Sequence, residues 1–289
     1  MTSEFYERSN ERFLKLLSYY LNAEDTLVKK QAVEEVSACG VSREYAFALI
    51  LAESLGVDTD GVDREFFNEY FLPSVKELSV EDYYADEYFS LVKFDGEKAG
   101  DAELTYMAYA PFQGFVRDDF EYFINGKVLP LIGFFPTEYR YPAIKKNGRE
   151  WMTLLPNEIN SQIRYVNEAF GKVLTYGLGL GYYALKVALK KEVESVTVID
   201  IDEEVVSLFK TEILPLFPKN IAEKIKVIKA DAFKFAESLK DGSFDYIYAD
   251  IWHDAADGVE LYKKFKSLER FCPSARYGYW IEQTMKYYM

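Results

Sequence analysis

Apolar and polar residues follow three different patterns along the chain, and each pattern predicts a different kind of structure. Before about residue 84 the apolar positions recur every three to four residues, as in ERFLKLLSYYL (residues 11–21), which is typical of amphipathic helices. From 85 to 150, runs rich in aromatic residues are separated by Gly, Pro and Asn-Gly turns. This pattern predicts short strands, and it includes EYFSLVKF at residues 87–94.

After residue 150, short apolar runs alternate with helical patterns. A helix is predicted from Asn160 to Phe170, and helices separate the five strands that follow, KVLTY (172–176), SVTVID (195–200), IKVIKA (225–230), FDYIYAD (244–250) and RYGYWIE (276–282). Strands joined by helical crossovers pair in parallel and are covered on both faces. We therefore predict an α/β chain: a Rossmann-like, doubly wound, mostly parallel sheet at 151–289, preceded by a helical region at 1–84 and a β-rich cap region at 85–150.

Composition narrows the class of protein. The chain is 49% apolar and 28% charged, and it has no apolar run near the ~18 residues of a membrane span. Its polar N-terminus resembles no targeting signal, so we expect a cytoplasmic protein without membrane contact. One histidine and two cysteines, Cys39 and Cys272, encode neither a metal site nor a disulfide framework. The net charge of −14 makes nucleic acid an unlikely partner and is compatible with a cationic substrate.

The predicted ligand site is the edge where the parallel strands end, because such sheets bind ligands beyond their carboxyl ends. Three glycines, Gly177, Gly179 and Gly181, follow the first strand and leave backbone N–H groups exposed to a ligand, although they could also serve tight helix packing. Asp200 ends the second strand, where a carboxylate can accept ribose hydroxyls. Asp231 and the Ala232 N–H follow the third strand and suit an adenine edge, although Asp231 could instead be a helix cap.

These residues resemble the nucleoside-binding motifs of class I S-adenosylmethionine-dependent methyltransferases and of their relatives, the spermidine synthases. VLTYGLGLG (173–181) resembles the first motif, which implies that the glycines wrap the methionine part of S-adenosyl-L-methionine and that Asp200 holds its ribose. KADAF (229–233) resembles the adenine motif. FDYIYAD resembles the fourth strand, which implies that Asp250 and His253 are the candidate bases and that Trp252 lies on the substrate side. The resemblance thus implies a methyltransferase with a small-molecule or protein acceptor.

Two departures from the family leave alternatives open. Thr175 stands where many methyltransferases have an acid, and the chain ends after a fifth strand. The first alternative is aminopropyl or related alkyl transfer to an amine, favoured by the acidic N-terminal half, although the strand end Asp250-Ile-Trp-His lacks that family's Asp-Ser-Ser-Asp pattern. The second is a non-catalytic nucleoside-binding module. The loose fingerprint Gly179-x-Gly181-x-x-Ala184 keeps a nicotinamide enzyme as a weaker alternative.

The fifth strand would be an exposed aromatic edge, and such edges aggregate unless they are covered. We expect strands from 85–150 or a second copy of the chain, as in a homodimer, to cover it.

Overall fold

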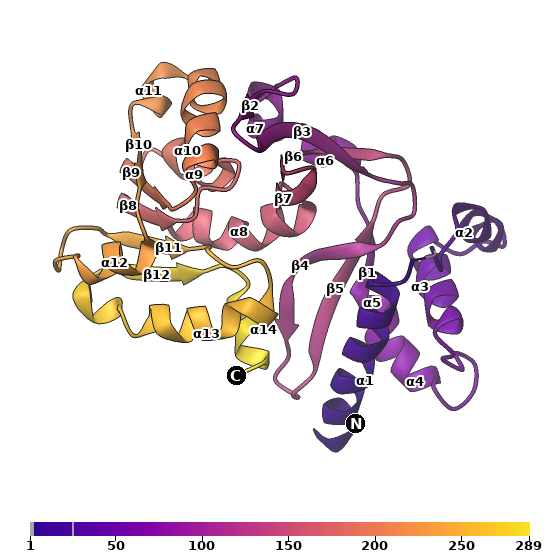
Figure 1. The fold of residues 1–289 in the computed structure, drawn as a ribbon. Helices are drawn as coiled ribbons and strands as arrows, with labels where there is room; N and C mark the ends of the chain where they lie inside the picture. The colour runs from indigo at the N-terminus through magenta and orange to yellow at the C-terminus, as the bar shows by residue number, and fades with distance from the viewer. Residues whose placement is uncertain (1–2, 25) are drawn as a thin grey trace. The chain divides into compact units, whose positions relative to one another are not determined.

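The computed structural model describes residues 3–24 and 26–289 (Figure 1). These residues form two compact units, and each unit is made of two separate parts of the chain. Of the described residues, those up to 83 and 108–140 make the first unit, and 84–107 and 141–289 make the second. None of the helices in the described ranges has the length and the apolar character needed to cross a membrane.

The first unit packs helices against a three-stranded sheet of order β1-β5-β4, in which β1 is parallel and β4 antiparallel to β5. Its core is aromatic, and Phe47 stacks on Phe134 with ring centroids 4.4 Å apart. Ser42 caps the helix that follows it, since its side chain accepts a hydrogen bond from the Tyr45 N–H. The elements are α1 (Ser3–Leu21), α2 (Lys30–Ser37), α3 (Arg43–Ser54), α4 (Arg64–Phe66), η1 (Phe67–Phe71), α5 (Leu72–Ser74), β1 (Val75–Glu77), α6 (Val80–Tyr84), β4 (Phe115–Tyr122) and β5 (Val128–Phe134).

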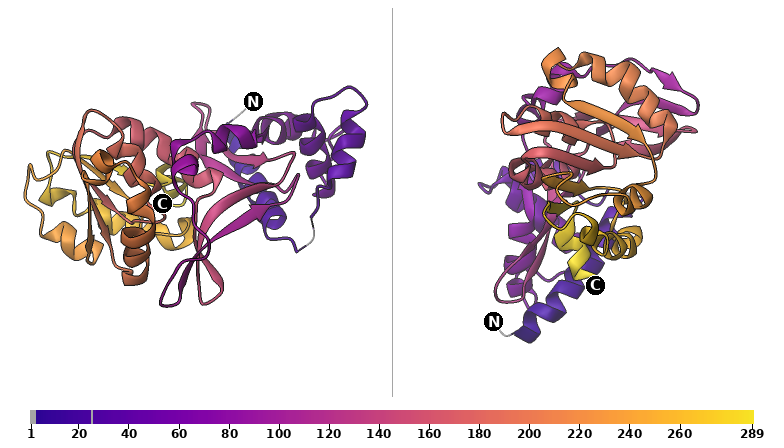
Figure 2. Two further views of the ribbon diagram at one scale, coloured as in Figure 1. Left: turned by 90° about the horizontal axis from the view of Figure 1, so that it is seen from above. Right: turned by 90° about the vertical axis from the view of Figure 1, so that its left-hand side faces the viewer.

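The second unit contains a five-stranded parallel sheet of order β10-β9-β8-β11-β12, so the predicted Rossmann-like parallel sheet is present (Figures 1 and 2). The chain order reverses between β8 and β11, which are neighbours at the centre. The strands are β8 (Gly171–Tyr176), β9 (Val193–Asp200), β10 (Ile225–Lys229), β11 (Tyr246–Ala249) and β12 (Arg276–Tyr279). Their bounds differ from the predicted runs by a few residues.

Helices cover both faces of this sheet, as its apolar strands require (Figure 1). On one face, Tyr183 of α9 stacks on Tyr248 of β11 at 4.2 Å. On the other face, Tyr176 of β8 packs against Phe265 of α13 at 4.7 Å. The helices are α8 (Pro156–Glu168), α9 (Tyr182–Ala188), α10 (Glu203–Leu208), η2 (Phe209–Ile213), η3 (Leu214–Leu216), α11 (Lys219–Ala222), α12 (Ala232–Glu237), α13 (Ala255–Lys266), η4 (Glu269–Phe271) and α14 (Glu282–Tyr287).

The sequence predicts a single β-rich cap at 85–150, whereas the structure divides these residues between the two units. A four-stranded sheet of order β2-β3-β6-β7 uses β2 (Lys98–Ala99), β3 (Ala102–Tyr109), β6 (Tyr139–Lys146) and β7 (Arg149–Thr153). EYFSLVKF is not a strand, since it begins with helix α7 (Glu87–Leu91), which Asp86 caps by accepting a hydrogen bond from the Tyr88 N–H.

Among the described residues, no strand from 85–150 pairs with the edge strand β12, although such pairing was one of the two expected covers. The parallel sheet ends at β12, and the strands of 85–150 belong to other sheets. Helices bury its aromatic side chains instead. Tyr279 packs against Tyr262 of α13 at 5.0 Å, and the indole N–H of Trp280, the next residue, donates a hydrogen bond to Ser161 Oγ of α8 at 2.9 Å.

Candidate functional site

Three of the predicted site residues lie side by side at the carboxyl edge of the parallel sheet. Tyr176 lies opposite both Ile199 and Ala249 in the strand register, so the residues that follow, Gly177, Asp200 and Asp250, lie side by side. Backbone hydrogen bonds continue past the strands, since the Gly177 N–H donates to Ile199 O at 2.9 Å and the Asp250 N–H donates to Tyr176 O at 2.8 Å. These hydrogen bonds hold the backbone at Gly177 and Asp250 in place at the edge.

The three glycines have positive φ angles but face different surroundings. A Cβ at Gly177 would lie 1.8 Å from the backbone oxygen of Asp250, and one at Gly181 would lie 2.2 Å from the Phe209 ring. Close packing thus explains both of these glycines. A Cβ at Gly179 would have no atom within 4 Å, so this glycine borders open space, as a ligand-facing position requires.

Asp200 joins the first two loops of the edge. Its Oδ2 accepts a hydrogen bond from the Leu178 N–H, and its Oδ1 accepts one from the Asp202 N–H, each at 2.8 Å. Burial raises the pKa of the Asp200 carboxyl above its ordinary value. Each carboxylate oxygen has a second lone pair, so the group could also accept hydrogen bonds from a diol.

Asp231 follows β10 and caps α12, with its Oδ1 accepting a hydrogen bond from the Lys234 N–H at 2.9 Å. The cap alternative is therefore present in the structure. Ala232 is the first residue of α12, where a backbone N–H has no acceptor within its own helix. An adenine ring would have an acceptor and a donor side by side here.

Asp250 forms an acidic cluster with α8 that the sequence analysis did not anticipate. The side-chain amide of Gln162 donates a hydrogen bond to Asp250 Oδ2 at 3.2 Å, and Glu158 lies one turn earlier on the same helix. Gln162 is 5% exposed, and its Oε1 is buried without a hydrogen-bond partner. The Oδ1 of Asn157 is also buried without a partner. The cluster therefore contains two carboxyl groups and two buried amide oxygens that have no hydrogen-bond donor.

The electrostatics of this cluster favour protons or a cation. Burial raises the pKa of Asp250 to about 7, partly offset by the Gln162 hydrogen bond and increased further by the charge of Asp200. Burial and the charge of Asp250 raise the pKa of Glu158 well above its ordinary value. Two half-buried carboxyl groups that repel each other cannot both ionise cheaply. Near neutral pH the pair therefore retains a proton, or it takes up a bound cation in its place.

His253 and Trp252 lie in different surroundings. The His253 Nδ1 is 3.2 Å from Asp257 Oδ2, and its ring meets Trp151 of β7 at 5.6 Å. The histidine is thus held at the solvent-exposed start of α13 rather than by Asp250. Trp252 is 5% exposed and packs edge-on against Tyr262, with its indole Nε1 buried and unpaired. It contributes to the packing beneath α13, and its place on the substrate side stays a prediction.

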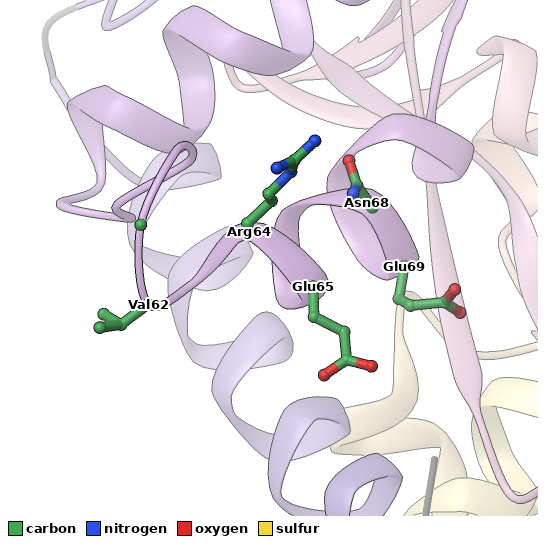
Figure 3. A pocket seen from close by; sticks show the side chains of 6 residues that line it. Val62, Arg64, Glu65, Asn68 and Glu69 are labelled. Carbon is green, nitrogen blue, oxygen red and sulfur yellow. The ribbon is translucent and has the colours of Figure 1, made fainter.

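A shallow hollow of about 440 Å³ lies in the first unit and contains none of the predicted site residues (Figure 3). Its walls are mainly the charged and polar side chains of α4 and η1, and Val62 at its rim is 91% exposed. The hollow brings together no set of groups with an evident chemistry. Its lining residues are Gly61, Val62, Arg64, Glu65, Asn68 and Glu69.

Comparison with known proteins gives one family match. The model of the spermine/spermidine synthase domain matches residues 165–271, a segment that includes the glycine loop, Asp200, Asp231 and Asp250. No curated protein matches the sequence. The prediction of a methyltransferase is therefore wrong, because the matching family is that of spermine and spermidine synthases.

Solved structures resemble parts of the chain at low identity. A probable spermidine synthase from Corynebacterium glutamicum is 20% identical over 43% of this chain and 51% of its own, with a TM-score of 0.32. A spermidine synthase in complex with the transition state analogue AdoDATO is 16% identical over 48% and 54%, with a TM-score of 0.37. A precorrin 8w decarboxylase from Methanobacterium thermoautotrophicum is 18% identical over 42% and 60%, with a TM-score of 0.31. The chain thus spans only 51% to 60% of the length of these proteins.

Proposed function

We propose that this protein transfers an aminopropyl group from decarboxylated S-adenosylmethionine to an amine. The observation that carries the proposal is the carboxyl pair of Glu158 and Asp250 at the sheet edge, where Asp250 lies in the segment 165–271 that matches the spermine/spermidine synthase domain and Glu158 lies on the helix that enters it. A protonated amine would supply the positive charge that this pair lacks. Its N–H groups would also satisfy the unpaired Gln162 Oε1.

The residues that would hold the donor nucleoside fit this group. Gly179 borders open space, Asp200 has acceptor capacity for a ribose, and Asp231 with the Ala232 N–H suits an adenine edge. When bound, the donor would supply a sulfonium-activated methylene carbon. The new C–N bond forms there as the C–S bond breaks, and the electron pair leaves on sulfur.

The acceptor nitrogen needs a free electron pair to react, so the ammonium has to lose a proton first. A pKa of about 7 makes Asp250 a base that is substantially ionised at neutral pH while it still holds a proton well. Gln162 would orient the Asp250 carboxylate through its 3.2 Å hydrogen bond. Glu158 would hold the charged form of the amine before the proton leaves. Positioning and exclusion of water would supply the rest of the acceleration.

The test uses the full-length protein with decarboxylated S-adenosylmethionine and a panel of monoamines and diamines. Mass spectrometry follows release of the thioether nucleoside together with the aminopropylated amine. We expect turnover with at least one amine and loss of at least a hundredfold in Asp250→Asn, the usual scale for a general base. Asp241→Asn is the matched control, because Asp241 lies at the opposite end of β11, near Ser274. Nucleoside binding without product from any amine would refute the proposal.

A further inference from the structure

Two loops of the candidate nucleoside site are held by residues from outside the parallel sheet. Segment 84–107 and the β6–β7 hairpin belong to the same compact unit as that sheet, although they precede it in sequence. Figure 1 shows α7 and β2 beside α9 and α10. The hydrogen bonds described below end on the loops of the candidate nucleoside site.

Tyr88 of α7 holds the glycine loop. Its hydroxyl donates a 2.7 Å hydrogen bond to the backbone oxygen of Leu180, and its side chain is fully buried. The neighbouring Asp86 strengthens the attachment, since its Oδ2 accepts hydrogen bonds from Tyr182 OH at 3.1 Å and from Lys186 Nζ at 2.9 Å. Leu180 follows Gly179, the glycine that borders open space, so α7 fixes the loop just behind its ligand-facing position.

Lys146, at the end of β6, holds the second loop. Its Nζ lies 2.6 Å from Asp202 Oδ2 and 2.9 Å from Glu204 Oε2. The Asp202 N–H in turn donates to Asp200 Oδ1, so a continuous series of hydrogen bonds runs from Lys146 to the candidate ribose acceptor. The Asp101 N–H adds a 3.1 Å hydrogen bond to Glu204 Oε1.

We infer that Tyr88 and Lys146 are positioning residues for the nucleoside donor. Each acts through a loop residue, Tyr88 through Leu180 and Lys146 through Asp202. A loop held in its binding conformation loses less entropy when a ligand binds, so both residues raise donor affinity without touching the donor. The inference rests on the proposed function, because it assumes a nucleoside at this edge, and it concerns donor binding rather than the acceptor chemistry.

The test compares Tyr88→Phe and Lys146→Met with wild type, using S-adenosylhomocysteine and methylthioadenosine as probes in calorimetry. Tyr88→Phe removes one hydrogen bond and Lys146→Met removes the ion pairs with Asp202 and Glu204, and each variant keeps most of its side-chain volume. We expect donor-side affinity to weaken by about three- to tenfold in each, the scale of one net hydrogen bond. In steady-state assays the KM for the donor should rise by a similar factor. The kcat at saturation and the KM for the amine should stay within about twofold.

The first unit offers a matched control for each variant. Tyr70→Phe also removes a buried tyrosine hydroxyl with a 2.7 Å hydrogen bond, to Asn10 Oδ1. Lys127→Met also removes a lysine from an ion pair, with Glu69 at 3.2 Å. Both controls should lower the melting temperature yet bind the probes as wild type does. An equal loss of affinity in the controls would overturn the inference, because general destabilisation would then explain it.

The outcomes separate this inference from the proposed function. Wild-type affinity in folded Tyr88→Phe and Lys146→Met overturns the positioning role and leaves the proposed transfer intact. A wild-type protein that binds neither probe overturns both. If Tyr88→Phe does not fold, Lys146→Met still decides the result, because its side chain is 26% exposed and tolerates change more readily. In a third outcome the wild-type protein binds the probes normally but shows no turnover, and both variants bind the probes more weakly. This outcome would support the positioning role and refute only the transfer.

Discussion

Replacing Asp250 with Asn should stabilise the second unit at alkaline pH, whatever reaction the protein catalyses. The folded pKa of Asp250 is about 7, whereas its ordinary value is 3.8. Between these values the folded chain binds more protons than the unfolded chain, so wild-type stability falls as pH rises from 4 to 7. An asparagine has no such titration, and its side-chain oxygen can still accept the Gln162 hydrogen bond.

The size of the effect follows from the two pKa values. At 1.36 kcal/mol per pH unit, the full difference corresponds to about 4 kcal/mol above pH 7. Asp250 is only half-buried, and water screens part of this cost, so we expect about 2 to 4 kcal/mol. The two proteins should differ little below pH 4, where the aspartate is protonated in both its folded and unfolded states.

The assay is urea unfolding at pH 4, 6 and 8, followed by tryptophan fluorescence. All three tryptophans, Trp151, Trp252 and Trp280, lie in the second unit, so the signal reports that unit. Asp241→Asn is a control of opposite sign. Its hydrogen bonds from Ser274 lower the pKa of Asp241, so this variant should lose stability at pH 8 and recover as pH falls. A pH-independent change in Asp250→Asn, or destabilisation at pH 8, would refute the electrostatic account.

Three further outcomes test the site. Gln162→Met removes the donor that lowers the pKa of Asp250, so the acid limb of kcat/KM should move up by about one pH unit, whereas Ser161→Ala on the same helix should leave it in place. Gly179→Val should fold and bind methylthioadenosine at least tenfold more weakly in calorimetry, because its side chain enters the open space; normal binding would remove this loop from the site. Gly177→Ala should lower the melting temperature, since its Cβ would overlap the Asp250 carbonyl; an unchanged melting temperature would contradict the close approach.

Local patterns were enough to predict the parallel sheet. Its strands are short apolar runs, the first four end at or within two residues of a Gly or Asp, and a helix follows each, so the hydrophobic periodicity and the turn residues predict the same elements. The same logic predicted a strand at 87–94, where a tertiary feature decides the outcome. Asp86 caps a helix there, and Tyr88 is buried against the glycine loop, which local alternation does not reveal.

The division into units could not be predicted from the sequence, because neither unit is continuous. The 108–140 segment joins the N-terminal helices, while 84–107 joins the parallel sheet. Both segments have the same aromatic, strand-like composition. Their partners are chosen by contacts far along the chain, so composition alone predicted a single region.

The acidic cluster was missed for a related reason, although it determines the charge of the proposed acceptor. The predicted helix began at Asn160, but α8 begins at Pro156, and this added turn carries Glu158. Asp250 lies 88 residues from Gln162 in sequence, and only the fold joins them. The net charge of −14 could not predict this site, since exposed charges are screened by water and salt. Two half-buried carboxyls are screened less than exposed charges, so this pair favours a proton or a cation, and a protonated amine meets that requirement.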